Sequence, residues 1–71
     1  MPEDVKAHIT GVVFQITSKV GDAVAAGDPV IVLESMKMEI PVEAPRAGKV
    51  KEIKVTEGQT VQEGETVAVL D

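Results

Sequence analysis

Apolar residues recur in four short runs of the chain, at residues 12–16, 30–33, 50–55 and 67–70, and several of these runs alternate with polar residues. A period of two places every second side chain on the same face, which is typical of strands that cover a core on one side. The apolar residues are mainly valine and isoleucine, which favour strands over helices. The pattern therefore predicts a protein built from β-strands throughout.

The same pattern occurs twice, 37 residues apart. Nine of the 24 positions in residues 11–34 are identical to their counterparts in residues 48–71, with no gap. Glycine is expected where a turn needs positive φ or a strand bends sharply. All six glycines fall into three equivalent pairs: Gly11 with Gly48, Gly21 with Gly58, and Gly27 with Gly64. Neither copy is long enough to bury its own apolar face, so we expect the two copies to share one core.

We therefore predict one domain, residues 1–71, of the all-β class. Its expected form is a flattened antiparallel barrel or sandwich of two small four-stranded sheets with pseudo-twofold symmetry. The first repeat covers about residues 11–34, the hairpin tip residues 35–38, and the second repeat about residues 48–71. The segment 35–47 connects the repeats, and its counterpart falls beyond the C-terminal end. Residues 30–34 lead into the turn and residues 38–42 lead out of it with alternating polarity, which predicts a hairpin. This symmetry places Lys37 and the chain termini at opposite poles.

Composition narrows the possible functions. A net charge of −5 and a single aromatic residue, Phe14, argue against a nucleic-acid partner. The chain has no apolar run long enough for a membrane span or a secretory signal, so we expect a cytoplasmic protein without a membrane partner. It has no cysteine and one histidine, His8, and therefore lacks the side chains typical of a structural zinc site.

The segment ESMKMEI, residues 34–40, places Lys37 between two methionines at the predicted tip. Lys37 could be one more solvated lysine beside the five others in the chain. Met36 and Met38 could fill the core, a use that suits methionine, but at a protruding tip they would stay partly exposed. Soft, adaptable side chains in that position suit recognition by another protein, and we favour this interpretation.

The chain resembles the biotinyl/lipoyl carrier domains over essentially its whole length. The match includes ESMKM at residues 34–38, which fits the biotinyl pattern of a lysine flanked by methionines, and the paired glycines. The resemblance implies a barrel-sandwich hybrid fold with biotin attached covalently to Lys37 by a biotin protein ligase. The biotin arm would then carry carboxylate between the active sites of a biotin-dependent carboxylase. The residues expected to be recognised by the ligase are Glu34, Ser35, Met36, Met38 and Glu39.

Two other functions stay open. Lipoyl domains share this fold and usually present their lysine within Glu-Thr-Asp-Lys-Ala, whereas Met36 and Met38 here replace the aspartate and the alanine. The alternative is thus a lipoyl carrier, or a dual acceptor of biotin and lipoate, for a 2-oxoacid dehydrogenase system with a lipoate ligase as partner. The other open function is an unmodified module used only for protein contacts.

The two equivalent loops, residues 17–23 and 54–60, are equally long. The first repeat therefore has no room for the inserted thumb of some acetyl-CoA carboxylase carriers.

A catalytic role for the chain is disfavoured. A Schiff-base lysine must lose its proton through burial or a cationic neighbour, whereas Glu34 and Glu39 would favour the charged form of Lys37. The two glutamates could be an acid–base pair, but an exposed tip offers no means of giving them different protonation states. We predict a non-catalytic carrier that is itself the substrate of a ligase, with no metal site.

Overall fold

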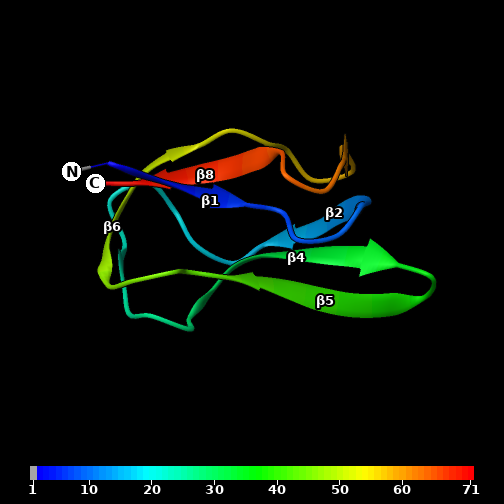
Figure 1. Ribbon diagram of the computed structural model, residues 1–71, viewed down its shortest axis with the longest axis horizontal. Coiled ribbons are helices and arrows are strands. Elements are labelled where there is room, and N and C mark those ends of the chain that lie inside the picture. The colour runs from blue at the N-terminus through cyan, green and yellow to red at the C-terminus, as the bar shows by residue number, and fades with distance from the viewer. Residues whose placement is uncertain (1) are drawn as a thin grey trace.

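The computed structural model describes residues 2–71, which form two four-stranded antiparallel sheets without a helix (Figure 1). The predicted all-β class and the two four-stranded sheets are confirmed. One sheet has the strand order β1-β8-β6-β3 and the other has the order β5-β4-β2-β7. The strands are β1 (Glu3–Lys6), β2 (Gly11–Ile16), β3 (Ala23–Val24), β4 (Pro29–Ser35), β5 (Met38–Glu43), β6 (Gly48–Ile53), β7 (Thr60–Val61) and β8 (Thr66–Leu70).

The two sheets share one pairing scheme at the 37-residue offset. Strand β2 pairs with β4 so that Val13 lies opposite Leu33, and β6 pairs with β8 so that Val50 lies opposite Leu70. In both pairs the register shifts immediately after that position, which makes a β-bulge in the same place. The repeat in the sequence is therefore a repeat in strand pairing.

The repeat in the structure extends further than the 24 compared positions. Strand β5 agrees with the predicted outgoing strand of the hairpin, residues 38–42, and its counterpart is β1. Leu33 pairs with Ile40 on one side of the molecule, and Leu70 pairs with Glu3 on the other. Placing the counterpart beyond the C-terminus was wrong because β1 precedes Gly11, outside the compared region. Among residues 2–10, the identities are Val5 with Val42 and Ala7 with Ala44.

Loops of each copy are hydrogen-bonded to strands of the other copy. The Gly21 N–H donates to the Val50 carbonyl over 2.7 Å, and the equivalent Gly58 N–H donates to the Val13 carbonyl over 2.8 Å. Both glycines have positive φ, 95° and 90°, which a residue with a Cβ rarely adopts. The copies are thus interlocked through their backbones as well as through their core.

The core lies between the sheets and consists mostly of valine. Burying one Val, Leu or Ile side chain contributes roughly 1.5–3 kcal/mol, so a 71-residue chain depends on nearly all of these contacts. The core residues are Val5, Ala7, Val13, Val30, Ile31, Leu33, Val42, Ala44, Val50, Val55, Val61, Val67, Ala68 and Leu70. Leu33 and Leu70 are fully buried at equivalent places, so each anchors the end of its own strand pair.

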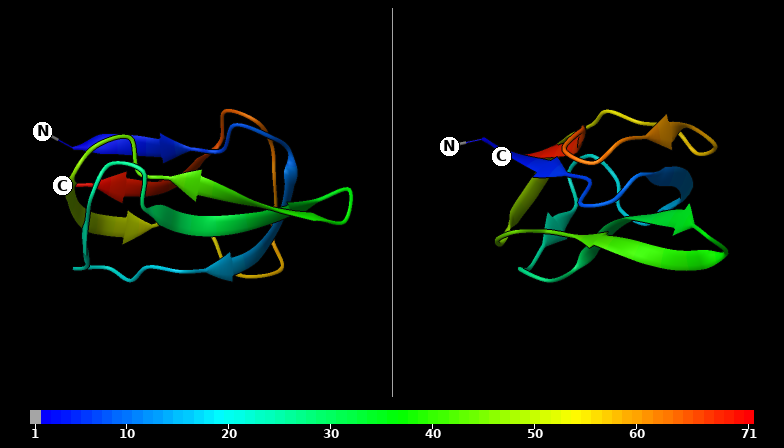
Figure 2. Two further views of the ribbon diagram at one scale, coloured as in Figure 1. Left: turned by 90° about the horizontal axis from the view of Figure 1, so that it is seen from below. Right: turned by 45° about the vertical axis from the view of Figure 1, so that its right-hand side comes forward.

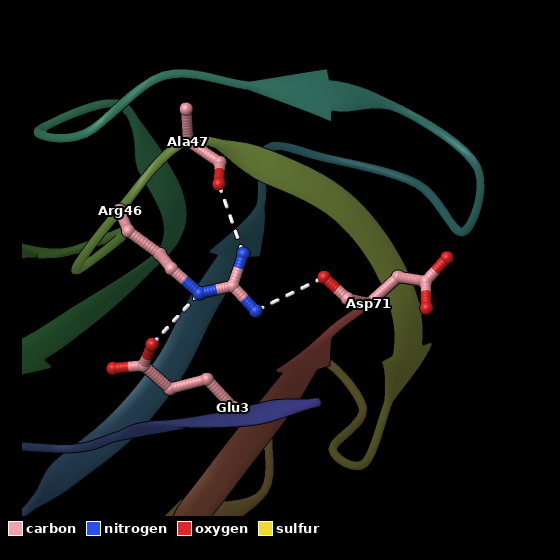
Figure 3. Close-up of polar contacts among 4 residues, drawn as sticks. All are labelled: Glu3, Arg46, Ala47 and Asp71. Atoms are coloured by element: carbon pink, nitrogen blue, oxygen red, sulfur yellow. Dashed lines mark hydrogen bonds and ion pairs between the residues drawn. The ribbon is translucent and has the colours of Figure 1, made fainter. Parts of the chain in front are cut away.

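The molecule is elongated, 33 × 17 × 17 Å, and its two long ends differ. The hairpin of β4 and β5 forms one end, and the start of β1 lies beside the end of β8 at the other (Figures 1 and 2). Arg46 ties the terminal end together (Figure 3): its Nε donates to Glu3 Oε1 over 2.8 Å, and its two other nitrogens donate to the backbone carbonyls of Ala47 and Asp71. Lys37 and the termini therefore lie at opposite poles, as the symmetry predicts.

Candidate functional site

The hairpin of β4 and β5 projects from the body of the molecule as its most extended feature (Figure 1). The two strands are paired from Pro29 opposite Glu43 to Ser35 opposite Met38. This register leaves Met36 and Lys37 as the two central residues of the turn. The lysine thus lies at the apex of a short hairpin whose far end is anchored in the core.

Both turn residues have a left-handed backbone, with φ of 52° at Met36 and 66° at Lys37. Positive φ at both central positions defines a type I′ turn, whose twist matches that of the flanking strands and which usually contains Asn-Gly. For residues with a Cβ this conformation costs roughly 1–2 kcal/mol each. The turn is held in place because the buried Leu33 and the partly buried Ile40, paired across the strands, fix the register.

The side chains at the tip are open to solvent. Met36 is 90% exposed and Met38 is 59% exposed, so neither methionine fills the core. Lys37 is also exposed and, among residues 2–71, makes no ion pair. A primary amine that is reachable and unshielded is suited to covalent attachment of a group that bears a carboxyl.

The remaining predicted site residues lie at the base of the same turn. Glu34 and Glu39 are directly opposite each other on β4 and β5, and both are exposed. Ser35 is half-buried and lies opposite Met38. Two carboxylates facing each other across a strand pair repel and weaken the pairing, so local stability does not explain this arrangement. The structure therefore brings all the predicted residues together at one end of one hairpin.

Gly11 supports the base of the hairpin, and sequence reasoning missed this contact. A Cβ on Gly11 would lie 2.7 Å from the backbone carbonyl oxygen of Glu34, which is closer than real Cβ contacts. Only glycine lets β2 pass this close to the end of β4. The recurrence of Gly11 at Gly48 was visible in the sequence, but the partner of the close approach was not.

The part of the chain that the structure describes offers few other candidate sites. Residues 2–71 contain no pocket and no group of three or more His, Cys, Asp and Glu side chains that could hold a metal ion. His8 is exposed in a bend after β1. No helix long and apolar enough to cross a membrane occurs in these residues.

The chain is similar to proteins whose names refer to biotin or to a carboxylase. Residues 1–70 match the family described as "Biotin-requiring enzyme". A "biotinylated protein" homolog of Mycobacterium leprae is 44% identical, and the match covers 99% of both chains. The biotin/lipoyl attachment protein of Bacillus subtilis is also 44% identical, over 93% of this chain and 90% of that protein. The crystal structure of Kluyveromyces lactis urea carboxylase matches the whole chain with a TM-score of 0.95 and 39% identity, over 6% of the enzyme.

Proposed function

The chain belongs to the biotin/lipoyl family and is a biotin carrier domain, and we propose that Lys37 is the residue to which biotin is attached. The observation that carries this proposal is the position of Lys37 at the apex of an exposed type I′ turn between two exposed methionines. The five other lysines lie in or beside strands or in a loop, and none has such a setting. The amine at the tip is thus the one best placed for enzymatic modification.

The attachment is an acyl transfer carried out by a separate biotin protein ligase. The neutral Lys37 Nζ attacks the carbonyl carbon of biotinyl-adenylate, an amide bond forms, and adenosine monophosphate leaves with its electron pair. One proton is released from the nitrogen. The ligase must supply the base that takes up this proton, because the tip offers no buried base beside Lys37. The carrier is in this step the substrate and not the catalyst.

The ligase is proposed to recognise the residues around the turn. Met36 and Met38 offer adaptable apolar contacts, and Glu34 and Glu39 offer two carboxylates on one face of the hairpin. Ser35 keeps the base of the turn polar. The left-handed turn matters for this recognition because it fixes the direction in which Lys37 leaves the hairpin.

Once bound, biotin supplies a nitrogen that accepts and gives up carboxylate. The contribution of this chain is to present the arm on a rigid hairpin at the pole opposite its termini (Figure 2). Tethering raises the effective concentration of the group at each active site that the arm can reach. We propose that these active sites belong to a biotin-dependent carboxylase and that the carrier works in the cytoplasm.

Intact mass after incubation with biotin, ATP and a biotin protein ligase tests the assignment. We expect one biotinyl increment, placed on Lys37 by tandem fragmentation. Lys37→Arg should remove the increment, whereas Lys51→Arg, on a strand remote from the tip, should leave it unchanged. Circular dichroism and unfolding curves should be the same for all three proteins. Labelling of the Lys37→Arg variant would overturn the assignment.

Lipoylation is the second candidate, because the Bacillus subtilis relative is named a biotin/lipoyl attachment protein. The test is competition between the two ligases for the same carrier. The double variant Met36→Asp with Met38→Ala should lose biotinylation and gain lipoylation if the residues beside Lys37 set the choice. An unchanged preference would place ligase selectivity elsewhere on the chain.

A further inference from the structure

The outer side of the sheet that bears the hairpin carries a cluster of apolar side chains. We call it the outer apolar face, and it consists of Val12, Phe14, Val32 and Pro41. Val12 is 39% exposed and Phe14, the single aromatic residue of the chain, is 47% exposed. Val32 lies opposite Pro41 across β4 and β5, and the bulge at Phe14 lies beside Val32. These residues alternate with buried ones, so they point away from the core.

The other sheet provides an internal control for this face. Its strands have the same pairing and the same bulges, yet the positions equivalent to Val12 and Phe14 are two exposed lysines. Folding and solubility of this scaffold are thus compatible with charged side chains at these places. The counterparts of the four residues, in the order given above, are Lys49, Lys51, Val69 and Asp4. Three of these four counterparts are charged, so the fold does not require apolar side chains at Val12, Phe14 and Pro41, which points to binding.

The face is continuous with the hairpin tip. Val12 lies directly opposite Glu34, and Glu34 lies directly opposite Glu39. A row of two carboxylates therefore separates the outer apolar face from the turn that bears Lys37. A partner that covers the face is positioned along the same sheet that presents the lysine, and its basic side chains can meet the two carboxylates.

We propose that the outer apolar face is the docking surface for the carboxylase subunit that uses the arm, through an apolar patch with a basic rim on the enzyme. This inference rests on the proposed function. A second copy of the chain is a poor occupant, because a twofold interface brings the same surface of both copies together and both carry a net charge of −5. The face is small and suits a weak, short-lived complex, which a carrier that visits successive active sites requires.

Two relatives consist almost entirely of this domain. The Mycobacterium leprae and Bacillus subtilis relatives are spanned over 99% and 90% of their length, so little of either chain lies outside this domain. A carrier domain fused to its enzyme gains effective concentration from the linker. In relatives of that length the encounter depends on the surface of the domain itself, and an apolar face beside the tip is suited to this role.

The test exchanges side chains between the two equivalent faces. The double variant Val12→Lys with Phe14→Lys carries the residues that the other sheet already tolerates. The control is Lys49→Val with Lys51→Phe on that sheet. The probe is the purified ATP-dependent biotin carboxylase subunit of the same organism, immobilised for binding measurements and assayed with the carrier as substrate. Both the unmodified and the biotinylated carrier are measured.

For Val12→Lys with Phe14→Lys we expect binding to weaken by about tenfold or more, because an aromatic anchor is lost from the contact. The KM for the biotinylated carrier should rise by a similar factor with kcat unchanged. The Lys49→Val, Lys51→Phe control should bind like the wild type. The neutral variant Phe14→Ser should also weaken binding, which separates the loss of apolar contact from the added positive charge.

Several outcomes would overturn the proposal. Unchanged binding and KM in the Val12→Lys, Phe14→Lys variant would remove the face from the complex with the carboxylase. A parallel loss of the biotinylation rate would assign the face to the ligase instead, and a wild-type dimer that the variant abolishes would assign it to a second copy. Failure of wild-type Lys37 to accept biotin concerns only the proposed function, since the unmodified carrier still reports binding at the face.

Discussion

The hairpin end and the terminal end of the molecule are built on equivalent pairs of strands. Strand β4 pairs with β5 at one end, and β8 pairs with β1 in the same register at the other. The two ends differ in what joins the paired strands. At the hairpin end a two-residue turn joins Ser35 to Met38, and at the terminal end Arg46 joins β1 to the residue after β8 through Glu3 and Asp71.

The same pair of strands is thus held together in two different ways. The turn joins the two strands covalently at the tip, so no side-chain contact is needed at the turn itself and the residues there are left exposed. At the terminal end the Arg46 guanidinium donates hydrogen bonds to Glu3, Ala47 and Asp71 and so joins β1 to the residue after β8 (Figure 3). One pole therefore leaves its side chains exposed, and at the other pole the Arg46 side chain holds the strands together.

Alanine at the two equivalent glycines should break the hairpin end more than the terminal end. At Gly11 the added Cβ meets the Glu34 carbonyl oxygen at 2.7 Å, and the backbone must move. At Gly48 the atom at 2.7 Å is a guanidinium nitrogen of Arg46, which can swing away, and the Asp71 carbonyl oxygen is 3.5 Å distant. We expect Gly11→Ala to lower the free energy of unfolding by about 1–3 kcal/mol and Gly48→Ala by less than about 1 kcal/mol.

Urea unfolding followed by circular dichroism measures both free energies. Gly11→Ala should also slow biotinylation, because it displaces the strand that leads to the turn. Equal losses of stability at the two glycines would show that the close approach at the hairpin base is not the tighter one.

The turn itself should be improved by a residue that accepts a left-handed backbone. Met36 has φ of 52°, and asparagine tolerates this region better than methionine does. Met36→Asn should therefore raise the free energy of unfolding by about 0.5–1 kcal/mol. The same variant should slow biotinylation, since it removes a methionine that is 90% exposed and proposed to contact the ligase.

Met38→Asn is the matched control for that experiment. Met38 belongs to β5 and has an extended backbone, so asparagine there brings no relief of strain and lowers strand propensity. Stabilisation by Met36→Asn alone would show that the tip is kept strained for recognition. A loss of stability in both variants would contradict this explanation.

The sequence predicted the fold because the fold repeats. Glycines and core valines recur at one spacing, and two copies of a short β-unit have few ways to bury their apolar faces. The sequence did not reveal β1 as the counterpart of β5. Among residues 2–10, only Val5 and Ala7 are identical to the residues 37 positions later. It also could not reveal the left-handed turn, because neither Met36 nor Lys37 is a usual residue for it. Register, set by burial at distant positions, overrode local preference.

The outer apolar face shows a second limit of sequence reasoning. Alternation indicates that Val12 and Phe14 lie on the same face of a strand, but it does not indicate which face is covered. The lysines at the equivalent positions of the second copy, Lys49 and Lys51, are the signal that marks that face as exposed. Comparison of two internal copies, position by position, therefore carries information about function that neither copy holds alone.

Removal of the Arg46 side chain should have the smallest effect and should act at the terminal end alone. Arg46 and Glu3 are 35% and 46% exposed, and ion pairs as accessible as this one contribute roughly 0.2–1 kcal/mol. We expect Arg46→Ala to lower the free energy of unfolding by about that amount. Glu3→Gln should have a smaller effect, because it removes the charge and leaves the Arg46 contacts to the Ala47 and Asp71 carbonyls.

Amide hydrogen exchange locates this effect along the chain. Arg46→Ala should speed exchange in β1 and at the end of β8, where Glu3 lies opposite Leu70, and should leave β4 and β5 unchanged. Higher salt should reduce the difference between wild type and variant, because an exposed ion pair is screened. The rate of biotinylation should be the same in both, since the turn at Lys37 lies at the opposite pole. Faster exchange in the hairpin would mean that the two ends are coupled through the core, and the terminal contacts would then contribute to how Lys37 is presented.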